Sequence, residues 1–356
     1  MNNVPNLFKK IFINPFLVFK GEREKVFDLL KLAAMLFVVL DHCLQRSCPN
    51  CQTTQVYNFI FLTQMPVFMF VSGYFALKQI YKIQELDIKD KTTYLVKKIL
   101  SLLVPFVSFS IIEAILSQNF TIIYKSFYLP QNSLWFLWAL LFLELFIYFS
   151  QIISLKIFRN ISFKTFALSC FLFCFTLVCV APLYLFEIVP DVKLILYYSL
   201  FFMFGYLFAF LVIFVNPNIL EKTIIKLLVF IISLIVVVVV MILRPTLILD
   251  PETPLNILLR VLGSIGSIMV FYEGFSLLPN SRILDMISRA GRISLEFYFI
   301  HLLVLKIPSF NQEINNVLFF ALEYLLVVTI TFSIICILKT NILTNFVFFG
   351  KIQKKR

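Results

Sequence analysis

The feature that most constrains this chain is a series of long apolar segments, each about as long as a membrane is thick. A helix needs about 20 apolar residues to cross ~30 Å of hydrocarbon. Ten segments qualify, approximately 26–44, 55–77, 94–116, 133–155, 164–185, 193–215, 224–243, 255–275, 292–309 and 317–338. Every backbone polar group inside a bilayer must be satisfied within its own segment, which requires helices here. We therefore predict an all-α integral membrane protein, a polytopic bundle of about ten transmembrane helices.

Composition excludes a soluble fold. Hydrophobic residues make up 61% of the 356 positions and charged residues only 14%, whereas soluble domains hold roughly 45–50% apolar and about 25% charged residues. The net charge of +12 is explained by topology rather than by nucleic-acid binding. On the ten predicted helices, 24 of the 31 basic residues fall at the two ends of the chain and on alternate loops, and five fall on the opposite loops. Basic loops stay on the cytoplasmic side, so both termini are predicted to be cytoplasmic.

The predicted organisation is a single membrane domain with short flanking segments. Residues 1–25 form a cytoplasmic or interfacial N-terminal segment in which basic and apolar residues alternate, a pattern suited to the membrane surface. Residues 26–340 form the ten-helix domain, and 341–356 form a basic cytoplasmic tail.

The chain has only two histidines, His42 and His301, and each ends an apolar segment. Imidazole suits proton transfer near neutral pH, and ionisable groups inside a bilayer usually line a buried site or a pathway. At 100° per residue, Asp28 and Lys31 lie within about 40° and 20° of the direction of His42, and Lys31 lies roughly 16 Å from it along the helix. Asp41 is expected near the outer surface, within reach of water. One alternative is that Lys31 merely pairs with Asp28 and that the histidine is structural.

Four stretches carry a resemblance to a known family. They are D-x-x-K-x10-H (28–42), QMPVFMFVSGYF (64–75), SLWFLWALL (133–141) and ISLEFYFIH (293–301). In this order and spacing the chain resembles the acyltransferase-3 family of membrane O-acyltransferases, and looks closest to the branch that acetylates sugars. The resemblance implies ten helices and transfer of an acyl group, usually acetyl from acetyl-CoA, to a hydroxyl of an envelope glycan. Lys31 and His42 match the family's Arg-x10-His pair, although lysine offers a point charge in place of a bidentate guanidinium. Gln64 stands where histidine often precedes Met-Pro.

The residues suit this chemistry. Attack on a thioester by an alcohol requires removal of the hydroxyl proton, and we predict neutral His42 as the base. Asp28 and Lys31 are expected to hold CoA or water, or to neutralise each other. An oxyanion needs hydrogen-bond donors, and Ser72, the amide of Gly73 and Trp135 are candidates. Direct transfer and an acyl-histidine intermediate both remain open.

Several further residues are candidates for binding substrate or donor, and some of them equally suit a structural role. Residues predicted to bind substrate or donor are His301, Ser72, Gly73, Tyr74, Trp135, Glu144 and Tyr298. Gly73 equally suits a close helix contact, and Trp135 an interfacial belt. Intramembrane carboxylates should face the interior or pair, namely Glu113, Glu144, Glu296 and Glu323. Candidates for the CoA phosphates are Lys97, Lys98, Arg282, Arg289 and Arg292, although the orientation of the protein in the membrane is enough to explain such charges.

Gly263 and Gly266 indicate helix packing. Cys48 and Cys51 are predicted to form a local disulfide, and no metal site is expected.

The favoured function is a membrane O-acetyltransferase of the bacterial cytoplasmic (inner) membrane, multi-pass, with acetyl-CoA as co-substrate and no permanently bound cofactor. Its acceptor would be lipopolysaccharide O-antigen, capsule or a lipid-linked sugar, and its other partners membrane lipids but no nucleic acid; the oligomeric state is not predicted. The alternative is a glycan or lipid transporter, or an export accessory protein. Against it, the two halves hold no matching pair of Gly/Pro-interrupted helices.

Overall fold

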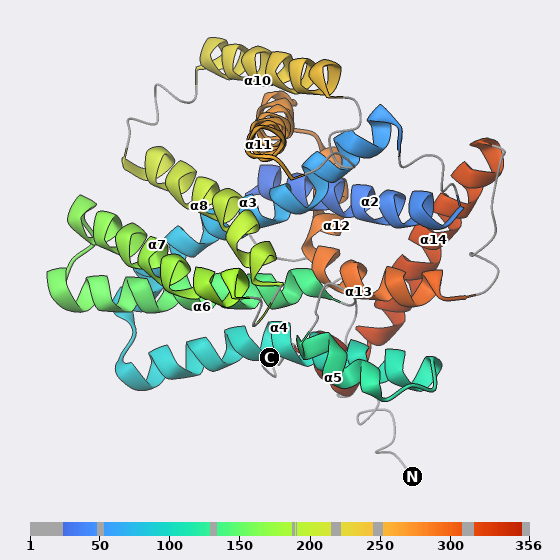
Figure 1. Cartoon of the computed structure of the whole chain (residues 1–356), viewed down its shortest axis with the longest axis horizontal. Helices are drawn as coiled ribbons and strands as arrows, with labels where there is room; N and C mark the ends of the chain where they lie inside the picture. The colour runs from blue at the N-terminus through green and yellow to red at the C-terminus, as the bar shows by residue number, and fades with distance from the viewer. Residues whose placement is uncertain are drawn as a thin grey trace. The chain divides into compact units, whose positions relative to one another are not determined.

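The computed structural model describes residues 24–47, 53–128, 134–186, 189, 191–214, 222–244, 252–307 and 317–350. These residues are helical almost throughout and contain no strand (Figure 1). The helices are α2 (Lys25–Ser47), α3 (Gln55–Glu85), α4 (Ile88–Leu116), α5 (Thr121–Tyr128), α6 (Trp135–Phe158), α7 (Phe163–Leu185), α8 (Val192–Phe214), α10 (Thr223–Leu243), α11 (Pro254–Leu277), α12 (Arg282–Ala290), α13 (Ser294–Leu305), α14 (Val317–Leu338) and α15 (Ile342–Phe349). A short 3-10 turn, η4 (Gly291–Ile293), joins α12 to α13. The all-α prediction is confirmed.

Eight of the described helices are long and apolar enough to cross a membrane: α3, α4, α6, α7, α8, α10, α11 and α14. The other two predicted spans also fall on helices, α2 and α13. The 23-residue α2 is long enough, but it carries five charged residues: Lys25, Asp28, Lys31, Asp41 and Arg46. The segment predicted as 292–309 contains a helix of only 12 residues, roughly 18 Å at 1.5 Å per residue. The count of ten spans and the side of each terminus stay predictions.

The chain divides into two compact units. The first unit comprises 1–71 and 212–341, and the second comprises 72–211 and 342–356. In the first unit, α2 contacts α11, α12, η4, α13 and α14. The first helix among the described residues is therefore packed among helices from the last third of the chain, which is the arrangement that positions the candidate site.

Capping residues define where the helices beside α2 begin. The Thr253 side chain accepts a hydrogen bond from the amide of Asn256 at 3.2 Å, and Pro254 occupies the first turn of α11. The Ser281 side chain likewise accepts from the amide of Leu284 at 3.2 Å and begins α12. These interactions satisfy amides that have no partner within the helix.

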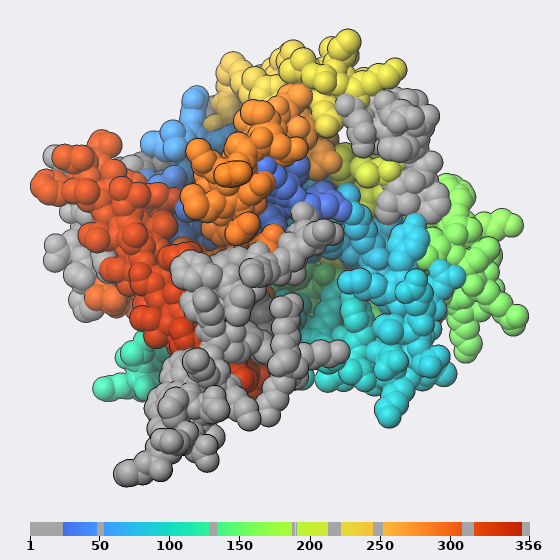
Figure 2. All heavy atoms as spheres, turned by 180° about the vertical axis from the view of Figure 1, so that it is seen from behind, coloured from blue at the N-terminus to red at the C-terminus, as the bar shows by residue number. Residues whose placement is uncertain are grey.

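Small residues allow the close packing of α10 on α11, which the space-filling view also shows (Figure 2). A Cβ on Gly266 would lie 3.0 Å from the Val237 side chain and 3.1 Å from the carbonyl oxygen of Ser233. On Gly263 it would lie 3.1 Å from the Leu62 side chain. The packing role predicted for these two glycines is confirmed.

In the second unit, α4 packs against α5, α6 and α15, and α6 packs against α7. Gly73 closes a contact between α3 and α8, because a Cβ there would lie 1.8 Å from the carbonyl oxygen of Phe202. Of the two roles predicted for Gly73, this geometry supports the close helix contact.

Candidate active site

The two histidines of the chain lie against each other in the first unit. The ring centroids of His42, on α2, and His301, on α13, are 5.4 Å apart with an interplanar angle of 33°. His301 is completely buried, whereas His42 is partly buried. The ring of Tyr298 lies 6.2 Å from that of His301. Folding thus brings together the only two imidazoles, 259 positions apart in sequence, at one interior point.

The tautomer of His301 is set by its own helix. Its Nδ1 lies 2.7 Å from the carbonyl oxygen of Phe297. A carbonyl oxygen can only accept, so Nδ1 carries the hydrogen and donates it, and Nε2 of the neutral ring is an acceptor. Nε2 is buried and has no hydrogen-bond partner among the described residues. The ring is therefore fixed in a form that can receive a proton or a hydrogen bond.

A buried polar shell adjoins the C-terminal end of α2. Asp41 accepts hydrogen bonds from the side-chain amides of Gln64, at 2.8 Å, and Gln45, at 3.1 Å. The Gln45 amide also lies 3.2 Å from the hydroxyl of Tyr57. Asp41 is only 3% exposed, so the expectation that it lies within reach of water is wrong. Burial is tolerated because two amide donors satisfy the carboxylate.

The N-terminal end of α2 carries a second cluster, built around Asp28. One carboxylate oxygen lies 2.6 Å from Nζ of Lys31 and the other 3.2 Å from Nε of Arg292. Nearby, Lys25 pairs with Asp285 of α12 at 2.8 Å. The Lys31–Asp28 pairing considered from the sequence is present, and the structure adds Arg292 to it. A lysine and an arginine at one point suit a phosphate ligand.

Gly291 permits this cluster to form. A Cβ at this position would lie 1.8 Å from the carbonyl oxygen of Asp28, so only glycine lets η4 approach the first turn of α2. Arg292 follows immediately and reaches Asp28 from there.

Gly291→Ala is therefore expected to destabilise the protein by about 1–3 kcal/mol, the usual cost of overpacking, and to separate Arg292 from Asp28. Thermal unfolding in detergent micelles measures the change. Gly274→Ala is the matched control, because its new Cβ would meet Phe230 at 3.5 Å, an ordinary contact. Equal unfolding midpoints for the two variants would contradict this reading of Gly291.

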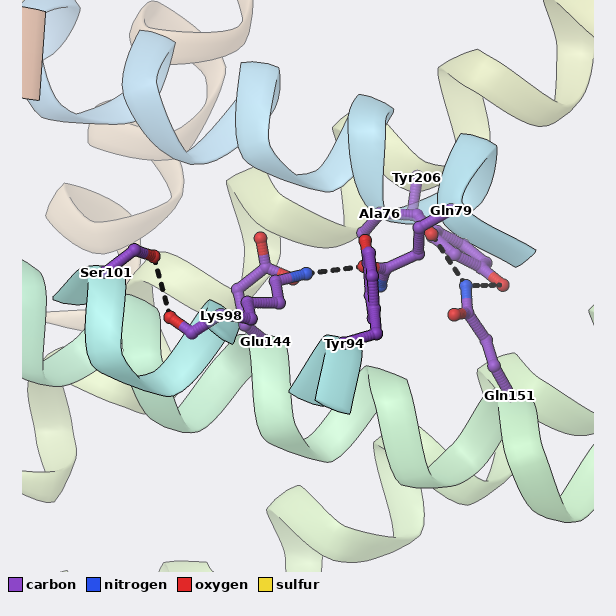
Figure 3. A network of polar contacts seen from close by, with 8 residues as sticks. All are labelled: Ala76, Gln79, Tyr94, Lys98, Ser101, Glu144, Gln151 and Tyr206. Atoms are coloured by element: carbon purple, nitrogen blue, oxygen red, sulfur yellow. Dashed lines mark hydrogen bonds and ion pairs between the residues drawn. The ribbon is translucent and has the colours of Figure 1, made fainter. Parts of the chain in front are cut away.

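Two predicted residues, Lys98 and Glu144, meet in the second unit (Figure 3). Nζ of Lys98 lies 2.6 Å from a carboxylate oxygen of Glu144 and also donates to the side-chain carbonyl of Gln79. The Tyr94 hydroxyl donates to the same carbonyl at 3.3 Å. The prediction that intramembrane carboxylates pair or face the interior is confirmed for Glu144. It is also confirmed by two pairs in the first unit, Glu296 with Lys339 at 2.6 Å and Glu323 with Ser47 at 2.7 Å.

The other residues predicted to bind substrate or the CoA phosphates lie on several different helices. In the second unit, Ser72 is partly buried, and the ring of the buried Tyr74 lies 4.9 Å from Nζ of Lys78. The Trp135 ring lies 4.8 Å from that of Tyr198. The phosphate candidates Lys97, Arg282 and Arg289 are exposed. Cys48 and Cys51 lie outside the described residues.

Sequence reasoning missed the polar shell of Asp41, Gln64, Gln45 and Tyr57. From the sequence, Gln64 is only a departure from the family pattern, and Asp41 is expected near the surface. The available signal was that Asp41 and Gln64 each lie within a predicted span, where a polar side chain needs a hydrogen-bond partner when it is buried.

Comparison with known proteins places the chain in a family. A model of the acyltransferase-3 family, described as an acyltransferase domain, matches residues 24–340. No curated protein and no solved structure matches the chain significantly. The matched range includes both histidines, both clusters on α2 and every described helix except α15. The chain therefore belongs to the acyltransferase-3 family of membrane acyltransferases.

Proposed function

We propose that this membrane acyltransferase transfers an acetyl group from acetyl-CoA to a hydroxyl of a cell-surface glycan, with His42 as general base. The observation that carries the proposal is the 5.4 Å pairing of His42 with His301 inside a family-matched acyltransferase domain. A pair of imidazoles, one completely buried and one partly buried, next to a polar shell, is suited to moving a proton.

The reaction follows from these groups. Neutral His42 takes the proton of the acceptor hydroxyl as its oxygen attacks the carbonyl carbon of the thioester. The bond between that carbon and the sulfur of CoA breaks, and the ester is released. The departing sulfur takes the proton back from His42, so the base is regenerated. General base catalysis of this kind contributes roughly 10²–10⁴-fold to a rate.

Lys31 and Arg292 are the residues we assign to the donor. They meet at Asp28, roughly 16 Å along α2 from His42 at 1.5 Å per residue. Cations at this point suit the phosphates of CoA, and the extended pantetheine chain would carry the thioester toward His42. Asp28 holds the two cations in position.

The membrane arrangement belongs to the same proposal. Both termini lie in the cytoplasm, the two shorter or more charged helices α2 and α13 complete ten spans, and the protein resides in the bacterial inner membrane. The cluster around Asp28 then faces the cytoplasmic supply of acetyl-CoA. The basic residues near the N-terminus of the chain support this orientation, because Lys and Arg next to membrane helices are concentrated on the cytoplasmic side.

Deletion of the gene tests the activity in cells. Acetyl groups are expected to disappear from the surface glycan, while the amount of glycan at the surface stays at the level of the parent strain. Mass spectrometry of the purified glycan measures the first quantity, and quantitative sugar analysis of whole cells measures the second. Restoring the intact gene is the control. Loss of glycan abundance with acetylation of the residual glycan intact would favour an export role instead.

A further inference from the structure

Two buried acceptor atoms in the first unit have no donor among the described residues. They are Nε2 of His301, which is 0% exposed, and Oε1 of Gln64, which is 4% exposed. Both assignments are fixed by the other end of the side chain. Nδ1 of His301 faces a carbonyl oxygen and the amide nitrogen of Gln64 faces the Asp41 carboxylate, so each remaining atom must be an acceptor.

The chemistry of these atoms defines what can bind to them. A buried acceptor without a donor is uncommon in native proteins and is costly. A phosphate, a carboxylate or a carbonyl oxygen brings no hydrogen and cannot satisfy it. A hydroxyl group can donate, and a compound with several hydroxyls can donate to more than one acceptor.

Distance relates the first acceptor to the reaction. The His301 ring lies 5.4 Å from the His42 ring, so two adjacent hydroxyls of one sugar can each reach one imidazole. Gln64 is tied to Asp41, the residue immediately before His42. It therefore belongs to the polar shell on the same end of α2.

We propose that His301 Nε2 and Gln64 Oε1 bind hydroxyls of the acceptor other than the one that reacts, and that the enzyme selects acceptors with adjacent free hydroxyls. The inference rests on the proposed function, because it assigns the reacting hydroxyl to His42. His301 is then a binding and positioning residue. It holds the neighbouring hydroxyl while His42 removes the proton.

The test uses purified full-length protein in lipid nanodiscs with acetyl-CoA and a set of methyl glycosides. Release of the CoA thiol is recorded with water as the only acceptor, and then with each glycoside and with its analogue lacking one hydroxyl of an adjacent pair. Glycosides with adjacent free hydroxyls are expected to stimulate thiol release. The matched deoxy analogues should require a roughly tenfold or greater concentration, because one buried acceptor stays unsatisfied.

Variants that lack one of the two acceptor atoms test whether these atoms cause the preference for adjacent hydroxyls. Gln64→Met and His301→Phe remove them with little change in size and are expected to raise the KM for the glycoside roughly tenfold or more. His301→Gln places an amide near the position of Nε2 and should recover part of the loss. Gln151→Met is the matched control, since Gln151 is equally buried in the second unit and its Oε1 also has no donor there. It should leave the KM unchanged. Thermal unfolding confirms that each variant is folded.

The outcomes are distinguishable. Equal stimulation by a glycoside and its deoxy analogue, no stimulation by any glycoside, or an unchanged KM in Gln64→Met would overturn the inference and leave these atoms to ordered water. Thiol release from acetyl-CoA would still stand in each case. Failure of the wild-type protein to cleave acetyl-CoA at all would instead defeat the proposed function.

Discussion

His42→Ala is expected to lower the rate of acetyl transfer by roughly 10²–10⁴-fold, the usual contribution of a general base. The loss should appear in kcat, while the KM for acetyl-CoA changes little, because the donor phosphates are assigned to Lys31 and Arg292 at the other end of α2. Labelled acetyl-CoA and isolated membranes suffice for the measurement.

Cys43→Ala is the matched control for His42→Ala. Cys43 is the next residue on α2 and is 0% exposed, but it has no part in the proposed chemistry. It should transfer acetyl groups at close to the wild-type rate. Undiminished transfer by a folded His42→Ala protein would end the assignment of His42 as the base.

Glu296→Leu is expected to destabilise the first unit by about 3–5 kcal/mol, the usual cost of breaking a buried ion pair. Glu296 and Lys339 lie 2.6 Å apart, and their side chains are 0% and 2% exposed. Removing the carboxylate leaves an ammonium inside the protein with its principal counter-charge gone. The pair also joins α13, which carries His301, to the end of α14, so the single variant should lose transfer activity along with stability.

Adding Lys339→Met to Glu296→Leu should restore most of the lost stability, because replacing both partners of a buried pair by apolar residues is often neutral or stabilising. The free energy of unfolding in mixed detergent micelles measures both effects. A double variant as unstable as the single variant would show that the Lys339 ammonium is not the source of the cost.

The helices were largely predictable from the sequence because lipid imposes a strict rule on length and polarity. Segments such as 224–243 and 317–338 appear as α10 and α14 within one residue. The segment 292–309 departs from prediction. Gly291 and Arg292 approach Asp28 through a 3-10 turn, so the continuous helix α13 begins only at Ser294. A contact with a distant helix, invisible in local hydropathy, decided this boundary.

The site was predictable in part. The placement of His42 and Lys31 on one helix followed from helical geometry, and His301 was suspected because ionisable residues in apolar segments are uncommon. The pairing of His42 with His301 depends on the packing of α2 against α13, because 259 positions separate the two histidines in the sequence. The contact of Gln64 with Asp41 likewise depends on the packing of one helix on another, here α3 on α2, although only 23 positions separate the two residues. Long-range packing of this kind leaves no local periodicity to read.

The most direct test of the account is an experimental structure of the protein with a non-hydrolysable acetyl-CoA analogue bound. The account predicts the thioester carbonyl beside the His42 imidazole, with His301 across from it and the CoA phosphates at Lys31 and Arg292. A thioester lying away from both histidines, or a His42 ring facing lipid with no cavity around it, would contradict it.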